Sequence, residues 1–135
     1  MKLLTYADIM DEGTSVFTAV AQVAEKKLHV EFKGVIRIEN PYNQLFNFIE
    51  ELKNKLTDIV VHNIVFDFTE LNYCNSNGFY VLMDIVEMVY QNLECPVVIK
   101  RLQDDDWQQE TLPILLNIEE DEISDRTVFV ELERV

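Results

Sequence analysis

The sequence contains little glycine and little proline, with three of each among its 135 residues. No segment rich in serine, glycine and proline separates two halves and no internal repeat is found, so we expect one domain over residues 1–135. Neither a P-loop nor a G-x-G-x-x-G motif is present, and three glycines are too few for the loops that hold nucleotide phosphates. We therefore expect no cofactor.

Cysteine and long apolar runs are also scarce. The two cysteines, Cys74 and Cys95, lie in apolar surroundings and fall short of the roughly four to eight that staple a small secreted domain. No stretch reaches the roughly 18 to 20 apolar residues of a membrane span, and the N-terminus lacks the pattern of a secretory signal. These absences predict a cytoplasmic protein with reduced cysteines and no membrane partner.

Positive charge is in the minority. The 11 Lys and Arg residues are outnumbered by 25 Asp and Glu residues, which gives a formal net charge of -14. Such a charge repels a phosphate backbone, so we expect no nucleic-acid partner. Residues 101–135 hold 11 acidic and 3 basic residues, with an acidic segment at 119–125 before a predicted last strand. We expect this end to steer the protein toward a basic partner surface.

Candidate metal ligands are few. His29 and His62 lie far apart in the sequence, with no His or Cys at ligand spacing. The acidic runs Asp104–Asp106 and Glu119–Glu122 lack the alternating oxygen ligands and the central glycine of a calcium loop. We predict no metal site and interpret both runs as solvated surface.

Candidate nucleophiles are equally few. Cys74 and Ser76 lie near a predicted strand-to-helix turn, but no G-x-S-x-G elbow surrounds them and only two histidines are available as a base. We predict no catalytic residue and no enzymatic activity, with Cys74 packed inside the fold.

The hydrophobic pattern predicts an α/β fold that begins with antiparallel strands. Residues 15–23 and 28–33 alternate apolar and polar side chains on either side of a short charged segment, as the two strands of a hairpin do. Gly34 then bends the chain into a further apolar stretch, Val35–Ile38.

The spacing next becomes that of a helix. Asn40 precedes Pro41 as a capping side chain precedes a proline in the first helical position. Apolar residues follow at spacings of three and four, namely Leu45, Phe46, Ile49, Leu52 and Leu56. Residues 64–68 are then almost continuously apolar, as in a strand covered on both faces.

The remaining elements alternate in the same way. A turn-rich segment, residues 72–78, leads into a second predicted helix whose apolar positions are Phe79, Leu82, Ile85, Val86 and Val89. Pro96–Ile99 predicts a short buried strand, residues 112–118 form an apolar stretch interrupted by Pro113, and residues 127–132 predict a last strand. The expected fold class is α/β, with a mixed sheet, an N-terminal antiparallel hairpin and helices packed mainly on one side.

One segment resembles a known family. Residues 64–79, from the apolar strand with Asp67 through Asn75-Ser76-Asn77-Gly78 to Phe79, are similar to the central motif of STAS domains, the anti-sigma-factor antagonist family. That motif has a buried strand with an aspartate, then Asp-Ser-Ser/Thr-Gly and an apolar residue where a helix begins. Asn75 and Asn77 stand where the family carries other residues.

The resemblance extends beyond this segment, over roughly residues 15–120. Gly34 matches the family's customary turn after an early strand, and the helix from Pro41 falls where the first family helix does. Residues 1–14 are interpreted as an N-terminal extension. The resemblance implies a single STAS-like domain, with Asp67 and Gly34 as structural motif residues.

The resemblance also implies a function. It implies a non-enzymatic bacterial signalling regulator that binds an anti-sigma factor or a histidine-kinase-like serine kinase, with a serine phosphatase possible as a third component. Partner binding is expected at Asn75, Ser76, Asn77, Gly78 and Phe79, with Ser76 as the phosphorylation site. The alternatives are a small-ligand or nucleotide sensor that uses the same loop, and a structural subunit of a signalling assembly.

The physical basis for a switch at Ser76 is independent of the family. A helix N-terminus presents unpartnered N–H groups and the positive end of the helix dipole, so a phosphate there is stabilised. The simpler interpretation is that Asn75 or Ser76 caps the helix. We predict that Asp67 lies near the C-terminal end of a central strand, that Cys74 is buried and that Ser76 is exposed.

Overall fold

The computed structural model describes residues 1–134 and shows an α/β fold with one mixed seven-stranded sheet and four helices. The strands are β1 (Lys2–Asp11), β2 (Thr14–Ala24), β3 (Lys27–Ile36), β4 (Asn63–Asp67), β5 (Leu71–Cys74), β6 (Val97–Leu102) and β7 (Thr127–Leu132). The helices are α1 (Pro41–Leu56), α2 (Ser76–Asn92), α3 (Asp106–Leu116) and α4 (Asp121–Ser124). None of these helices is long and apolar enough to cross a membrane.

The sheet has an antiparallel half and a parallel half. The strand order is β1-β2-β3-β4-β6-β7, and β5 pairs with β3 outside this path. β1, β2 and β3 are antiparallel neighbours, whereas β4, β5 and β6 join by parallel pairing, as does β7. The predicted hairpin, strand-helix units and last strand are confirmed. Asp67 ends β4, a central strand, as predicted.

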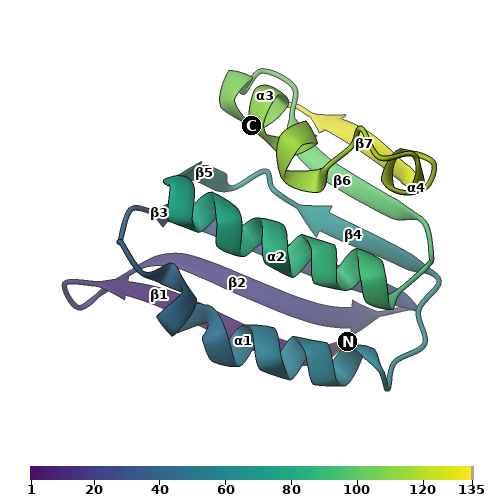
Figure 1. Cartoon of the computed structure of the whole chain (residues 1–135), viewed down its shortest axis with the longest axis horizontal. Helices are drawn as coiled ribbons and strands as arrows, with labels where there is room; N and C mark the ends of the chain where they lie inside the picture. Colours follow the sequence, from purple (N-terminus) through teal and green to yellow (C-terminus); the bar gives the residue numbers. More distant parts are fainter. Residues whose placement is uncertain (135) are drawn as a thin grey trace.

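The helices lie on one face of the sheet. Figure 1 shows α1 and α2 side by side across this face, with α3 and α4 beside β6 and β7. The apolar core fills the space beneath them and contains a row of phenylalanine rings. Ring centroids lie 5.5 Å apart between Phe32 and Phe68 and 6.1 Å apart between Phe66 and Phe68. Continuous apolar runs predict these central strands well, because both their neighbours and the helices cover them.

The N-terminal residues belong to the sheet, which corrects their interpretation as an extension. β1 pairs with β2 along its length, and Leu4 and Ile9 are buried in the core. The pairing register shifts between Leu3 and Thr5 and again between Ile9 and Met10. Because such bulges interrupt the alternation of side chains, this strand has no regular period of two in the sequence.

Gly34 lies inside β3 and not at a turn between two strands. Its φ is +104°, and a Cβ on it would lie 2.2 Å from the carbonyl oxygen of Val16. β3 also changes its parallel partner here, since residues 27–31 pair with β4 and residues 34–36 pair with β5. Gly34 therefore allows β3 to bend close to β2 at the point where its parallel partner changes from β4 to β5.

Two details of α1 differ from the prediction. Asn40 makes no side-chain capping hydrogen bond, and the helix begins with Pro41 in its first turn. Phe46, which was expected in the core, is 59% exposed. Phe48 is buried in its stead, between Leu45 and Leu52. The spacings 45–46–49 and 45–48–52 both fit a helix, so periodicity alone did not separate the two phenylalanines.

Residues 72–78 also differ from the prediction, because β5 occupies part of the expected turn. Only Leu71 and Cys74 of this four-residue strand are buried, and the two residues between them are exposed. A strand this short has no readable alternation. Its existence depends on pairing with the end of β3, a contact between residues far apart in the sequence.

The first acidic run begins a helix, which corrects its interpretation as solvated surface alone. The Asp105 carboxylate caps α3 by accepting a hydrogen bond from the Gln108 N–H at 2.9 Å, and it also lies 3.5 Å from Arg134. The helix then continues through Pro113 to Leu116. Asp104 and Asp106 are exposed.

Candidate functional site at the start of helix α2

The Asn75–Phe79 segment forms the first turn of α2, with Ser76 as the first helical residue. The Asn75 side chain caps the helix by accepting a hydrogen bond from the Gly78 N–H at 2.8 Å. Ser76 is exposed, as predicted. Within residues 1–134 the N–H groups of Ser76 and Asn77 donate no hydrogen bond, so two donors lie beside the Ser76 hydroxyl.

Asn75 and Asn77 also connect α2 to the loop between β3 and α1. The Asn75 amide donates to the Ile38 carbonyl at 2.9 Å, and the Asn77 amide donates to the Glu39 carbonyl at 2.7 Å. Asn75 therefore both accepts and donates, which a carboxylate cannot do. The two positions that depart from the family motif hold a neighbouring loop against the helix.

Gly78 permits close packing of this first turn. A Cβ on Gly78 would lie 2.9 Å from the Cβ atoms of Cys74 and Ile36. Any larger residue would push the helix start away from β3 and β5. Gly78 is thus a packing residue, and its own surface is buried.

Of the two neighbouring aromatic residues in the first turns of α2, Tyr80 is the one exposed to solvent. Phe79 is half-buried and packs against the core, whereas Tyr80 is 54% exposed. The two rings meet edge to face, with centroids 5.8 Å apart. Phe79 still lines the hollow beside Ser76, but most of its ring surface is covered.

A shallow hollow of about 290 Å³ lies beside Ser76. It is lined by Cys74, Asn75, Ser76, Phe79, Tyr80, Trp107, Thr111 and Ile114. Trp107 packs against Tyr73 at a centroid distance of 6.3 Å, and the exposed Arg37 lies 5.1 Å above the Tyr73 ring. The first turn of α2 is therefore surrounded by aromatic side chains and one cation. Sequence analysis did not find these residues, because they come from the end of β3, from β5 and from α3.

Cys74 lies behind the hollow. It is buried, as predicted, and burial raises the pKa of its thiol to about 11. A thiol with this pKa is almost fully protonated near neutral pH, which makes it a poor nucleophile.

Asp67 lies away from Ser76. Its Oδ1 accepts hydrogen bonds from the Thr69 N–H at 2.9 Å and from the Thr69 hydroxyl at 2.6 Å, which closes the turn after β4. It faces Glu31 of β3 and Lys100 of β6 in the sheet register. Asp67 and Gly34 thus shape the sheet, whereas Asn75, Ser76 and Phe79 line the hollow at the start of α2.

A buried glutamine holds the segment that precedes this surface. Gln108 is fully buried in α3, and its Oε1 accepts a hydrogen bond from the Leu102 N–H at 2.8 Å. Its Nε2 donates to the carbonyls of Phe68 at 2.8 Å and Leu71 at 3.2 Å. Sequence analysis missed Gln108, since a glutamine in a helix is usually exposed and no local pattern marks its burial.

Across residues 1–134 no group of three or more His, Cys, Asp or Glu side chains is arranged to hold a metal ion. A scan of known protein-family models and a search of curated proteins both found no match to this chain.

Proposed function

We propose that this protein is a non-enzymatic cytoplasmic regulator of bacterial signalling that resembles STAS-type anti-sigma-factor antagonists. Its partner is an anti-sigma factor or a histidine-kinase-like serine kinase, which docks on the first turn of α2. The observation that carries this proposal is the exposed Ser76 at a capped helix start, which lines the same hollow as the aromatic side chains of Tyr80 and Trp107.

Phosphorylation of Ser76 is the proposed switch. The free N–H groups of Ser76 and Asn77 and the helix dipole stabilise a phosphate at this position. The phosphate adds about -1.5 to -2 charges beside a hollow whose lining side chains are all uncharged. A partner that buries this surface loses affinity, and a serine phosphatase restores it.

The shape of the surface supports a protein partner over a small ligand. Small-molecule pockets usually enclose about 300 to 1,000 Å³. The hollow beside Ser76 measures about 290 Å³ and is shallow and open to solvent. An exposed aromatic side chain next to a shallow hollow is typical of a protein interface.

The test uses the histidine-kinase-like serine kinases of the source organism, purified one by one. We expect one of them to bind the protein and, with Mg-ATP, to add a single phosphate that mass spectrometry places on Ser76. Ser76→Asp should weaken binding by about tenfold or more, because burying an unpaired charge is costly, whereas Ser76→Ala should bind nearly normally.

Two further variants complete this test. Tyr80→Ala should also weaken binding, while Thr14→Asp adds the same charge at an exposed hairpin position and should have no effect. The proposal fails if no kinase of this class binds, or if Ser76→Asp and Tyr80→Ala both bind as well as the unaltered protein.

A further inference from the structure

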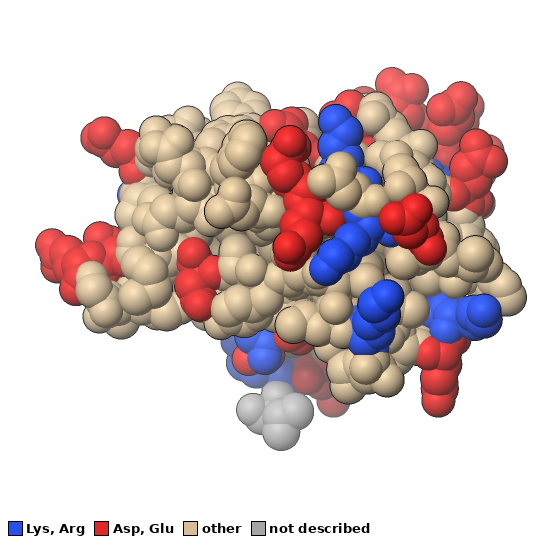
Figure 2. Space-filling model, turned by 90° about the horizontal axis from the view of Figure 1, so that it is seen from below, with Lys and Arg blue, Asp and Glu red and all other residues tan. Residues whose placement is uncertain are grey.

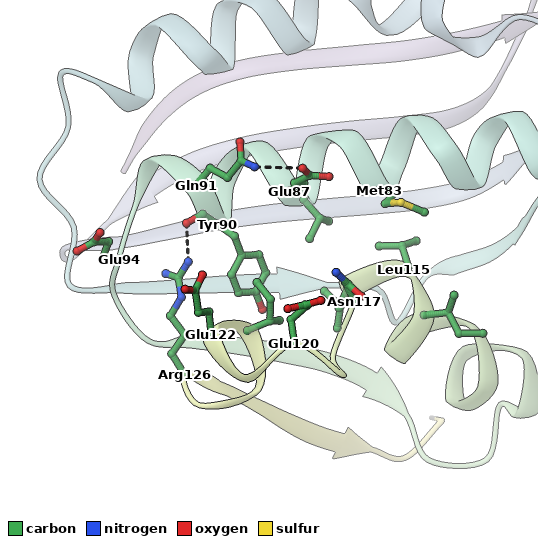
Figure 3. A pocket seen from close by; sticks show the side chains of 14 residues that line it. Met83, Glu87, Tyr90, Gln91, Glu94, Leu115, Asn117, Glu120, Glu122 and Arg126 are labelled. Atoms are coloured by element: carbon green, nitrogen blue, oxygen red, sulfur yellow. Dashed lines mark hydrogen bonds between the residues drawn. The ribbon is translucent and has the colours of Figure 1, made fainter.

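A second and larger groove runs between α2 and the α3–α4 segment. Its volume is about 930 Å³, and Figure 3 shows its lining side chains between the two segments. The floor is apolar, with Val86, Tyr90, Leu115 and Leu116 buried and with Met83 and Ile123 partly exposed. This groove lies outside the first turn of α2, although the exposed Ile114 borders both hollows.

The rims of the groove are acidic on both sides. Glu87 and Gln91 lie one turn apart on α2, Glu94 lies just beyond the end of this helix, and Gln91 donates a hydrogen bond to Glu87 at 3.0 Å (Figure 3). Glu120 and Glu122 lie on the opposite rim. All four carboxylates are exposed.

Arg126, the one cation that lines the groove within residues 1–134, is already engaged. Arg126 donates hydrogen bonds to the carbonyls of Tyr90, Leu93 and Cys95, and its guanidinium lies 4.7 Å above the Tyr90 ring. It therefore caps the C-terminal end of α2, where carbonyl groups lack helical partners. Its donors point to the backbone, so the acidic rims are left without ion-pair partners within residues 1–134.

The length of the groove points to a helical occupant. The lining residues of α2 extend from Met83 to Gln91, a distance of about 12 Å at about 1.5 Å per residue. A peptide helix places apolar anchors at positions i, i+4 and i+7 over about 10 Å, so two to three anchors fit on this floor.

We propose that this groove binds a basic amphipathic helix of a partner protein. Its apolar stripe packs on Met83, Ile114 and Ile123, the lining apolar side chains that reach the surface above the buried floor, and its Lys or Arg side chains pair with the glutamates of both rims. This inference identifies the kind of partner segment from shape and charge, and it does not depend on phosphorylation of Ser76.

The first experiment measures binding of labelled peptides to the full chain by fluorescence anisotropy at about 0.15 M salt. The probe is a peptide of about 18 residues with Leu at helical spacing and Lys on both flanks of the stripe. We expect it to bind at least about tenfold more tightly than a scrambled peptide of equal composition or a version with Glu in place of Lys. Equal binding of the scrambled peptide would show only general attraction to an acidic protein, and would overturn the proposal.

Matched charge reversals place the binding site. Glu87→Lys with Glu94→Lys should weaken binding by about tenfold or more. Glu50→Lys with Glu51→Lys changes the net charge equally on the exposed side of α1 and should alter binding by less than about twofold. Similar losses in the two double variants would contradict a site between α2 and α4.

Methyl NMR of the unaltered protein provides a readout that needs no variant. The largest peptide-induced shifts should come from Met83, Leu115 and Ile123. Shifts centred elsewhere would overturn the proposal, as would tighter binding of spermine than of the peptide, or self-association that closes the groove. Because Ser76 lies outside this groove, the Ser76 variants should bind the peptide normally, so the two proposals fail independently.

Discussion

The side-chain amides of Asn75 and Asn77 show how a single residue type can serve two purposes. Asn75 caps α2 through its oxygen and holds the Ile38 carbonyl through its nitrogen. Replacement by Asp keeps the acceptor but places a carboxylate against a carbonyl, which removes the donor and adds repulsion. The loop between β3 and α1 thus depends on side chains that a motif comparison treats only as departures.

At the same scale, Cys74 should resist chemical modification. Its burial and raised pKa, about 11, leave little thiolate near neutral pH, whereas Cys95 is only partly buried. We expect a thiol reagent to modify Cys95 first in the native protein, and both cysteines in denaturant. The measurement is the time course of labelling by mass spectrometry, with Cys95→Ser as the control. Rapid labelling of native Cys95→Ser would contradict the burial of Cys74.

Single residues of the site were only partly predictable. The exposure of Ser76 follows from the helix start alone and was predicted, and Asn75 was one of the two residues considered as the cap. The exposure of Tyr80 and the contact between Trp107 and Tyr73 depend on how α2, α3 and β5 pack together. No local pattern carries that information.

At the scale of elements, Gln108 links three separate segments. It joins the end of β6, the turn after β4 and the start of β5 through its buried amide. The position of the first turn of α2 follows from β5, so Gln108 is a positioning residue for the proposed docking surface.

Replacement of Gln108 should therefore cost stability. Gln108→Ala leaves the Leu102 N–H and the Phe68 and Leu71 carbonyls buried without partners, and we expect a loss of about 2 to 4 kcal/mol in the free energy of unfolding. Gln91→Ala, an exposed helical glutamine, should change it by less than about 0.5 kcal/mol. Urea denaturation measures both. A loss at Gln108 no larger than that at Gln91 would show that water replaces these bonds.

Elements with a strong local period were predictable, and those formed by long-range pairing were not. α1, α2, β4 and β7 follow from spacing and apolar runs. β1 was not predicted because bulges break the alternation of its side chains. β5 was not predicted because its four residues gain their partners only from β3. α3 was not predicted as a helix, because Asp105 lies within an acidic run that resembles exposed surface and Pro113 interrupts the apolar stretch that follows.

At the scale of the whole molecule, the negative charge is unevenly distributed. Figure 2, which views the α1 and β1 side, shows basic side chains between acidic ones on that face. Residues 101–135 contribute 11 of the 25 acidic residues and only 3 of the 11 basic ones. Self-repulsion is therefore concentrated at the β7 side, around the acidic α4 segment.

Screening of this repulsion should stabilise the protein. Raising NaCl from about 0.01 M to about 0.15 M shortens the Debye length from about 30 Å to about 8 Å, so we expect the midpoint of thermal unfolding to rise. The combined variant Glu119→Gln, Glu120→Gln and Glu122→Gln should show a smaller rise, because it carries less repulsion. Differential scanning calorimetry measures both slopes. A midpoint that falls with salt in the unaltered protein would mean that ion pairs outweigh repulsion.

The two edges of the sheet differ in a way that limits how copies can associate. At β1, the side-chain amide of Gln44 in α1 accepts a hydrogen bond from the Met10 N–H and donates one to the Met10 carbonyl. The Lys55 side chain donates to the Leu4 carbonyl. At β7, the Val97 N–H donates to the Arg126 carbonyl and the Gln103 N–H donates to the Leu132 carbonyl. Alternate residues of β7 therefore pair with β6, and the backbone groups of Thr127, Phe129 and Glu131 point away from it.

An added strand at β1 would compete with α1 side chains for the main-chain groups of Met10 and Leu4. The outward groups of β7 have no such partner within residues 1–134, so we expect the sheet to be extended by another strand first at β7.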